Sequence, residues 1–171
     1  MEPTPRHLTT TEQILIRDGI LVEYAPGYTL EADYARIESL RGAAIRQLTR
    51  RRYTAVTRTA LWIHTGRHLE AEPVQLTLSH PNTAAPYNVS RRRIHSSHLA
   101  EIGGMRVTIP ATTCVDFLLL EKADIAREAI EILLEAGKVT PVDIEAQLIE
   151  QRARNGSRRA RGTWRAMCLE G

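Results

Sequence analysis

A short β-branched stretch in the second half of the chain runs through a proline into a long apolar segment, and this transition most limits what the chain can fold into. Residues 107–109 (Val-Thr-Ile) favour a strand, because β-branched side chains pack well on a pleated surface. Pro110 presets φ for a first helical turn, and the apolar residues of 115–119 follow at helical spacing. The sequence therefore predicts a strand that leads directly into an apolar helix, whose apolar face is interrupted by Asp116.

The length and the cysteine content fit a protein of the reducing cytoplasm. The 171 residues suffice for one domain with its own hydrophobic core. Cys114 and Cys168 are the only cysteines, and their positions suggest neither a disulfide framework nor a zinc site. Residues 1–11 lack the apolar core of a signal peptide, and no segment reaches the roughly 18 uninterrupted apolar residues of a membrane span. We therefore expect a cytoplasmic protein with no membrane partner.

The remaining apolar pattern predicts a hairpin, a small sheet and further helices. Residues 20–24 and 28–30 flank Ala-Pro-Gly, which is typical of a β-hairpin. Strands are predicted over residues 73–80 and 88–95, and helices, besides the one after Pro110, over residues 31–52, 55–65, 123–136, 142–154 and 157–169. We expect an α+β fold, in which a small mixed β-sheet packs with about five or six helices.

Basic and acidic residues are segregated along the chain. Residues 39–69 contain seven arginines and no acidic residue, residues 121–150 contain eight acidic residues, and residues 151–171 contain six arginines against Glu170. Guanidinium groups bind phosphate or carboxylate in a bidentate manner, so such segments suit nucleic acid or an acidic protein surface. A GC-rich genome also produces many arginines and few lysines, so composition alone does not decide between these explanations.

Twelve arginines are the candidates for contact with nucleic acid or a partner protein. They are Arg41, Arg46, Arg50, Arg51, Arg52, Arg58, Arg91, Arg92, Arg93, Arg158, Arg159 and Arg161. Each cluster also has a structural explanation. Residues 50–52 would complement the negative end of a helix dipole, and residues 91–93 would protect an edge strand, with Arg92 pointing away from its two neighbours.

The sequence offers no basis for catalysis. His64 and His68 are spaced i, i+4, and His95 lies close to His98, but no third ligand accompanies either pair, so we expect no metal site. Neither lysine follows the Glu-x-Lys pattern of metal-dependent nucleases. The chain also lacks a glycine-rich phosphate loop and a Gly-x-Ser-x-Gly elbow. We therefore expect a non-catalytic protein without a cofactor.

Several segments together resemble a known family. Residues 105–119 are similar to the V-T-x-P-x-R-T-x-x-D-L signature of the AbiEi family of type IV toxin–antitoxin antitoxins and their actinobacterial relatives, the transcriptional regulators. Two positions depart from it, since Thr112 stands where the family usually has Arg and Phe117 where it has Leu. Four further segments resemble the family more weakly and occur in the same order as in the family. They are residues 55–64, 74–78, 91–95 and 139–141.

The resemblance implies a non-catalytic protein that acts through a nucleotidyltransferase-type toxin, its operator DNA or both, without the need for a stable complex with the toxin. Family members commonly begin with a winged helix-turn-helix domain, and residues 19–30 resemble its closing wing. The 18 residues before this wing are too few for its helices, so we expect residues 1–30 to be a remnant of that region and residues 31–171 to form the AbiEi-like domain. Two alternatives stay open: a general nucleic-acid-binding module that uses the Arg-rich patches, and a folded remnant of a longer regulator.

Asp116 needs a partner that the sequence does not identify. A carboxylate on an apolar helix face is costly unless it is paired or hydrogen-bonded. In the family, an arginine four residues earlier could supply the charge, but this chain has Thr112 there. Three options remain: Arg106, one of residues 91–93, or hydrogen bonds from the backbone and from Thr112 or Thr113.

Overall fold

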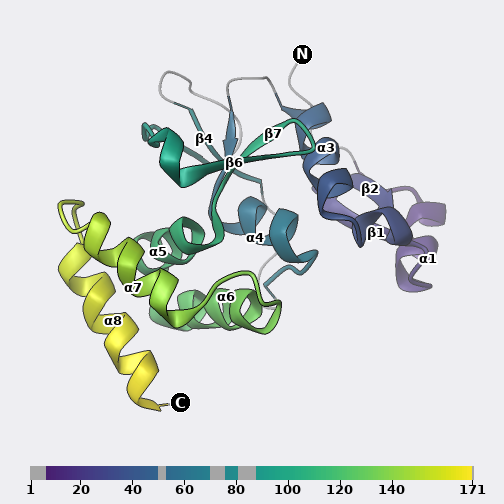
Figure 1. Ribbon diagram of the computed structural model, residues 1–171. Helices are drawn as coiled ribbons and strands as arrows, with labels where there is room; N and C mark the ends of the chain where they lie inside the picture. The colour runs from purple at the N-terminus through teal and green to yellow at the C-terminus, as the bar shows by residue number, and fades with distance from the viewer. Residues whose placement is uncertain (1–6, 50–52, 70–75, 81–87, 171) are drawn as a thin grey trace.

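The computed structural model describes residues 7–49, 53–69, 76–80 and 88–170, and these residues form a mixed α+β fold with two sheets and eight α-helices (Figure 1). The predicted fold class is confirmed, although the described residues hold more helices than the five or six expected. The division of the chain into a winged-helix remnant and an AbiEi-like domain stays a prediction. None of the described helices has the length and apolar character to cross a lipid bilayer.

The N-terminal part contains the predicted hairpin. Its elements are α1 (Thr10–Arg17), β1 (Leu21–Ala25), β2 (Tyr28–Glu31) and α2 (Ala32–Ala35). The two strands pair antiparallel, with Leu21 opposite Glu31. Gly27 supplies the positive φ of 77° that the turn requires, and its N–H donates to the Glu23 carboxylate at 2.7 Å. The hairpin is therefore fixed by local chemistry that the sequence shows.

The prediction of one long helix over residues 31–52 is wrong, because Ile37 adopts an extended conformation with φ −97° and ψ 118°. The chain forms α2 and then α3 (Glu38–Leu48), and residues 50–52 lie outside the described part of the chain. In a continuous helix the Ala35 carbonyl would accept from the N–H four residues later. Here it accepts from the Arg41 guanidinium at 2.7 Å, which compensates for the break. Three apolar side chains of this segment are consequently on the surface, since Tyr34 is 50%, Ile37 49% and Leu40 37% exposed.

The larger sheet has five strands in the order β5-β4-β3-β7-β6. They are β3 (Thr54–Ala55), β4 (Thr77–Ser79), β5 (Asn88–Ser90), β6 (Leu99–Ile102) and β7 (Met105–Thr108). β3 is parallel to β7 and antiparallel to β4, while β5 is parallel to β4 and β6 antiparallel to β7. The strand predicted over residues 88–95 is therefore too long, since it ends at Ser90.

The other helices lie mainly below this sheet in Figure 1. They are α4 (Thr57–Thr65), the short 3-10 helix η1 (Ser96–His98), α5 (Pro110–Leu120), α6 (Ala123–Glu135), α7 (Pro141–Glu150) and α8 (Ser157–Glu170). α5 contacts α4, α6, α7 and α8, so it is the central helix of this layer. The predicted passage from strand to helix is confirmed, because β7 ends at Thr108 and α5 begins at Pro110.

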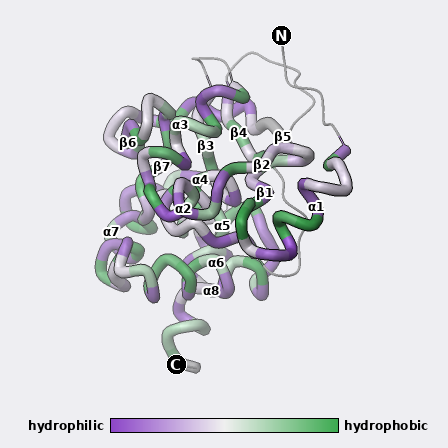
Figure 2. The backbone as a smooth tube through the Cα atoms, turned by 90° about the vertical axis from the view of Figure 1, so that its right-hand side faces the viewer, coloured by the Kyte–Doolittle hydropathy of each residue, from purple (hydrophilic) through white to green (hydrophobic). Residues whose placement is uncertain are grey.

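Two hydrophobic cores share α4. Leu61 packs with α5–α8 in a core that includes Phe117 and Trp164, while Trp62 packs with the sheet and α3 in a core that includes Ile45. The trace in Figure 2 shows polar and apolar residues interspersed along the helical layer, as expected for helices with one buried side. α4 therefore contributes side chains to both cores.

One contact between α3 and the β6–β7 turn is made backbone to backbone. A Cβ atom on Gly42 would lie 2.1 Å from the Ile102 carbonyl oxygen, and one on Gly103, whose φ is 58°, would lie 2.0 Å from the Ser39 carbonyl oxygen. Only glycine fits at these two positions without a shift of the backbone. This contact fixes α3 against the edge of the sheet.

Candidate functional site

Asp116 is fully buried in α5 and binds two arginines. Arg92 donates to it in a bidentate manner, with Nη1 2.5 Å from Oδ1 and Nη2 2.6 Å from Oδ2. Arg154 donates from Nη1 to Oδ1 at 2.9 Å. Of the options that the sequence left open, the structure selects the cluster at residues 91–93, and it adds Arg154, which sequence reasoning missed.

The backbone around each arginine explains these positions. The Ser79 hydroxyl lies 3.1 Å from the Ser90 carbonyl oxygen and 2.8 Å from that of Arg92, which holds the chain after β5 close to β4. Arg154 lies in the turn between α7 and α8, where its N–H donates to the Gln151 carbonyl at 3.0 Å. The carboxylate therefore joins two segments that are about 60 residues apart in sequence to the central helix.

The charges of this group do not cancel. One carboxylate faces two guanidinium groups, whose side chains are 22% and 25% exposed, whereas Asp116 is 0% exposed. The surplus is one positive charge at the edge of the core. A buried carboxylate requires such partners, because burial of an unpaired charge is costly.

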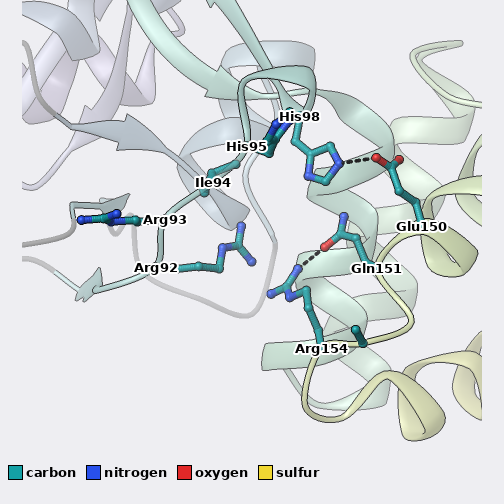
Figure 3. Close-up of a pocket in the computed structure, with 9 residues that line it drawn as sticks. Arg92, Arg93, Ile94, His95, His98, Glu150, Gln151 and Arg154 are labelled. Atoms are coloured by element: carbon teal, nitrogen blue, oxygen red, sulfur yellow. Dashed lines mark hydrogen bonds and ion pairs between the residues drawn. The ribbon is translucent and has the colours of Figure 1, made fainter.

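A cleft of about 320 Å³ opens beside Arg92 and Arg154, the two arginines that bind Asp116 (Figure 3). Its lining residues are Arg92, Arg93, Ile94, His95, His98, Glu150, Gln151, Ala153 and Arg154. Glu150 is the only acidic residue among them, and its carboxylate lies 2.9 Å from Nε2 of His98. The cleft therefore has far more hydrogen-bond donors than acceptors, which suits an anionic ligand.

Two polar groups at the cleft keep unused donors. Gln151 is 7% exposed, and its Oε1 accepts from Arg154 Nη1, but its Nε2 has no hydrogen-bond partner in the described structure. Arg154 binds both Asp116 and Gln151 through Nη1 alone. Its Nε and Nη2 make no hydrogen bond to the described residues. Nε2 of Gln151 is buried, and a buried donor without a partner is costly, whereas the unused donors of Arg154 belong to a side chain that is 25% exposed. Together these donors offer a place for an acceptor.

Arg92 and Arg93 point in opposite directions (Figure 3), as predicted, although both residues lie after β5 and not within a strand. Arg92 faces the cleft and binds Asp116, while Arg91 and Arg93 are exposed. These residues follow β5 rather than continue it, so they do not protect an edge strand. The side chain of Arg93 extends away from the centre of the cleft.

Two further predicted contact residues are used within the fold. Arg41 is only 4% exposed and donates to the carbonyl oxygens of Ala35 and Ile63, both at 2.7 Å. Arg58, whose side chain is 12% exposed, forms an ion pair with Glu121 at 3.1 Å. The expectation that Arg41 contacts nucleic acid is therefore wrong, because backbone carbonyls and burial occupy its guanidinium. At Arg58 little of the side chain reaches the surface.

The other predicted arginines are divided between α3 and α8. Arg46 on α3 donates to the Thr49 carbonyl at 2.8 Å, and residues 50–52 lie outside the described residues. On α8, Arg158 and Arg159 are exposed, although Arg159 also donates to the Leu119 carbonyl at 2.7 Å, and Arg161 is half-buried. The nine predicted arginines that the structure describes are therefore not brought into one patch.

The histidine pairs bind protein groups. His64 is buried between the Glu38 carboxylate, 3.1 Å from Nδ1, and the Thr108 carbonyl, 2.8 Å from Nε2. Both ring nitrogens of His64 are therefore occupied by contacts within the fold. His68 stacks on Trp62 at 5.9 Å between ring centroids, and burial lowers the pKa of His68. Within the described residues, no group of three or more metal-ligating side chains is assembled.

Cys114 is poorly suited to act as a nucleophile. It is buried in α5, and burial raises the pKa of its thiol far above the usual range. A thiol that stays protonated is a poor nucleophile.

Comparisons with models of protein families, with curated proteins and with solved structures find no match.

Proposed function

We propose that this protein is a non-catalytic regulator or antitoxin of the AbiEi kind that binds nucleic acid through the basic face of α8. The supporting observation is how α8 is docked. Ala160 and Trp164 are buried against the helical core, while Arg158 and Arg165 are exposed on the same helix. A helix fixed by its apolar side presents its charges in a constant arrangement, which suits contact with phosphates.

The turn before α8 extends this basic face. Arg152 is exposed in the turn, and Arg154 is held there by Asp116. No acidic residue lies between residues 151 and 169, so carboxylates of the same segment do not neutralise these arginines. Such a surface binds DNA in a manner that depends on salt, because each phosphate contact releases counterions.

The test is fluorescence anisotropy of the full chain with duplex DNA from its own upstream region and with a scrambled duplex, at several salt concentrations. We expect a preference for the upstream duplex that persists at physiological salt. The double variant Arg158→Glu/Arg165→Glu should weaken binding at least tenfold and reduce the salt slope. The matched control Arg17→Glu/Arg36→Glu makes the same charge change at side chains that are 76% and 81% exposed, and it should bind as the wild type does apart from a small general charge effect.

Antagonism of a nucleotidyltransferase-type toxin is the second candidate, and exposed apolar side chains on α7 and α8 favour it. Val142 is 73% exposed, Ile149 61% and Leu169 88%. Exposed apolar side chains of this size are suited to transient protein contacts. Co-expression with such a toxin should restore growth, and Ile149→Glu should abolish the rescue. Binding of both duplexes with equal affinity, together with rescue, would replace the DNA-binding proposal with toxin antagonism.

A further inference from the structure

We infer that the cleft beside Arg92 and Arg154 is a binding site for a small phosphorylated ligand of the nucleoside monophosphate class. This inference goes beyond the proposed contact of α8 with nucleic acid, and it does not depend on that contact. It rests on the donors that line the cleft, on the way Asp116 holds them, and on the size of the cleft.

The unused donors belong to two residues that lie three positions apart in the turn after α7. Arg154 has two unused donors, Nε and Nη2, and Gln151 has one, Nε2. None of the three makes a hydrogen bond to the described residues, and both residues line the cleft. Figure 3 shows the two side chains side by side, joined by their hydrogen bond. A phosphate group provides several acceptor oxygens with negative charge, which would satisfy an arginine and an amide together.

Asp116 holds these donors in place without neutralising them. It binds Arg154 through Nη1 only, and its own charge is already matched by the bidentate Arg92. The one surplus positive charge of the group therefore lies at the wall of the cleft. Because this charge is held before the ligand arrives, little ordering of side chains opposes binding.

The volume and the rest of the lining fit a nucleoside better than a duplex. Sites for small molecules occupy roughly 300–1,000 Å³, and the cleft of about 320 Å³ is at the small end of that range. DNA sites are open surfaces of roughly 600 Å² or more. The rings of His95 and His98, with centroids 6.2 Å apart, offer surfaces on which a planar base can stack. Ile94 and Ala153 add apolar contact.

The experiment is isothermal titration of the full chain with AMP, CMP, ribose 5-phosphate, inorganic phosphate and the dinucleoside monophosphate ApA. We expect saturable binding of AMP or CMP with a Kd below about 1 mM, and at least fivefold weaker binding of ribose 5-phosphate and inorganic phosphate. ApA has only an internal phosphate, so tighter binding of ApA than of AMP would assign the cleft to a nucleic-acid chain and overturn the inference. Absence of binding by AMP and CMP at 5 mM would also overturn it.

Two variants locate the binding. Gln151→Glu keeps the size of the side chain and the acceptor for Arg154, but it replaces the unused donor with a negative charge, so AMP affinity should fall at least tenfold. Arg91→Ala is the matched control, because it lowers the net charge by the same one unit while its exposed side chain does not line the cleft, and affinity should stay within twofold. Equal losses in the two variants would show a diffuse charge effect and contradict the assignment. Thermal unfolding of each variant confirms that it is folded.

The inference can be separated from the proposed function. The Arg158→Glu/Arg165→Glu variant changes α8 and leaves the lining of the cleft intact, so it should lose DNA binding and keep AMP binding. Failure of DNA binding in the wild type, together with AMP binding that Gln151→Glu removes, would refute the proposed function alone. The reverse result would refute the inference alone.

Discussion

Buried arginines serve two regions of this molecule in different ways. In the N-terminal region, Arg41 donates to two backbone carbonyls, those of Ala35 and Ile63, which lie at the ends of α2 and α4. Burial lowers the pKa of Arg41, and the charge of Glu38 acts in the opposite direction. At Asp116, by contrast, one carboxylate receives two guanidinium groups.

The two regions differ in how much of the arginine side chain is accessible to solvent. Arg41 is 4% exposed and stabilises the ends of two helices, where the helix dipole is negative. The Arg154 side chain is 25% exposed, and it combines an anchor in the core with free donors at the surface. Of these two arginines, only Arg154 has part of its side chain open to solvent and therefore accessible to a ligand. The following experiments test this comparison, beginning with the largest effect.

Loss of the carboxylate at Asp116 should be the most destabilising change. In Asp116→Asn, two guanidinium groups lose their counter-charge next to the core, so the free energy of unfolding should fall by about 3–5 kcal/mol in urea denaturation. Asp33→Asn is the control, since the Asp33 side chain is 85% exposed in its ion pair with Arg36 and should matter little. Equal effects of the two substitutions would mean that Asp116 does not hold the fold.

Removal of the Arg41 guanidinium should cost less and should leave the cleft unchanged. In Arg41→Met the carbonyls of Ala35 and Ile63 lose their donors, and the free energy of unfolding should fall by about 2–3 kcal/mol. Titration with AMP should give the wild-type affinity under conditions where the variant is folded. Arg46→Met, on the same helix but half-buried, should cost under about 1 kcal/mol. A fall in AMP affinity in Arg41→Met would contradict the separation of the two regions.

The close contact of α3 should make Gly42→Ala destabilising by about 2 kcal/mol. The added Cβ would meet the Ile102 carbonyl oxygen at 2.1 Å, and neither backbone can move without displacing Arg41 or the sheet. Thermal unfolding measures the effect, and Gly162→Ala on α8 is the control, because a Cβ there meets nothing within 4 Å. A neutral Gly42→Ala would show that α3 is not fixed against the β6–β7 turn.

The smallest expected effect is a pH dependence at Glu38, next to the Arg41 region. Burial alone would raise its pKa, but the hydrogen bonds and charges of Lys138 and His64 together outweigh this and place the pKa below its ordinary value of 4.5. A carboxyl whose folded pKa is lowered contributes stability above its unfolded pKa, and this contribution is lost as pH falls through the folded value.

The Glu38 side chain is 34% exposed, so the contribution should be about 1 kcal/mol or less. The difference in unfolding free energy between wild type and Glu38→Gln should be present at pH 7 and shrink below pH 4.5. A difference that grows on acidification would contradict the sign of the shift.

Elements with local signals could be predicted from the sequence. Pro110 marks the start of α5, and Thr140 begins α7 with a capping box to Asp143, so both helix starts were predicted within about one residue. Gly66 ends α4 with the left-handed conformation expected of a C-cap glycine. In each case the deciding feature, a fixed or positive φ or a capping hydrogen bond, lies within a few residues of sequence.

Features that depend on distant residues could not be predicted. The break at Ile37 depends on Arg41 binding across to α4, and β3 has only two residues, whose partners lie in β4 and β7. The sequence left three options for the partner of Asp116, one of which was the cluster at residues 91–93, but Arg154 carried no signal beyond the basic composition of its segment. The cleft results from the same long-range pairing, so no short motif in the sequence indicates it.

The division of the interior into two cores has a practical consequence for spectroscopy. The chain has two tryptophans, and each core contains one: Trp62 is stacked between Tyr24 and His68, and Trp164 lies among the helices. Replacement of either by phenylalanine leaves a single intrinsic fluorophore in one core. Emission curves of the two single-tryptophan proteins therefore report separately whether the halves joined by α4 melt in one cooperative transition or in two.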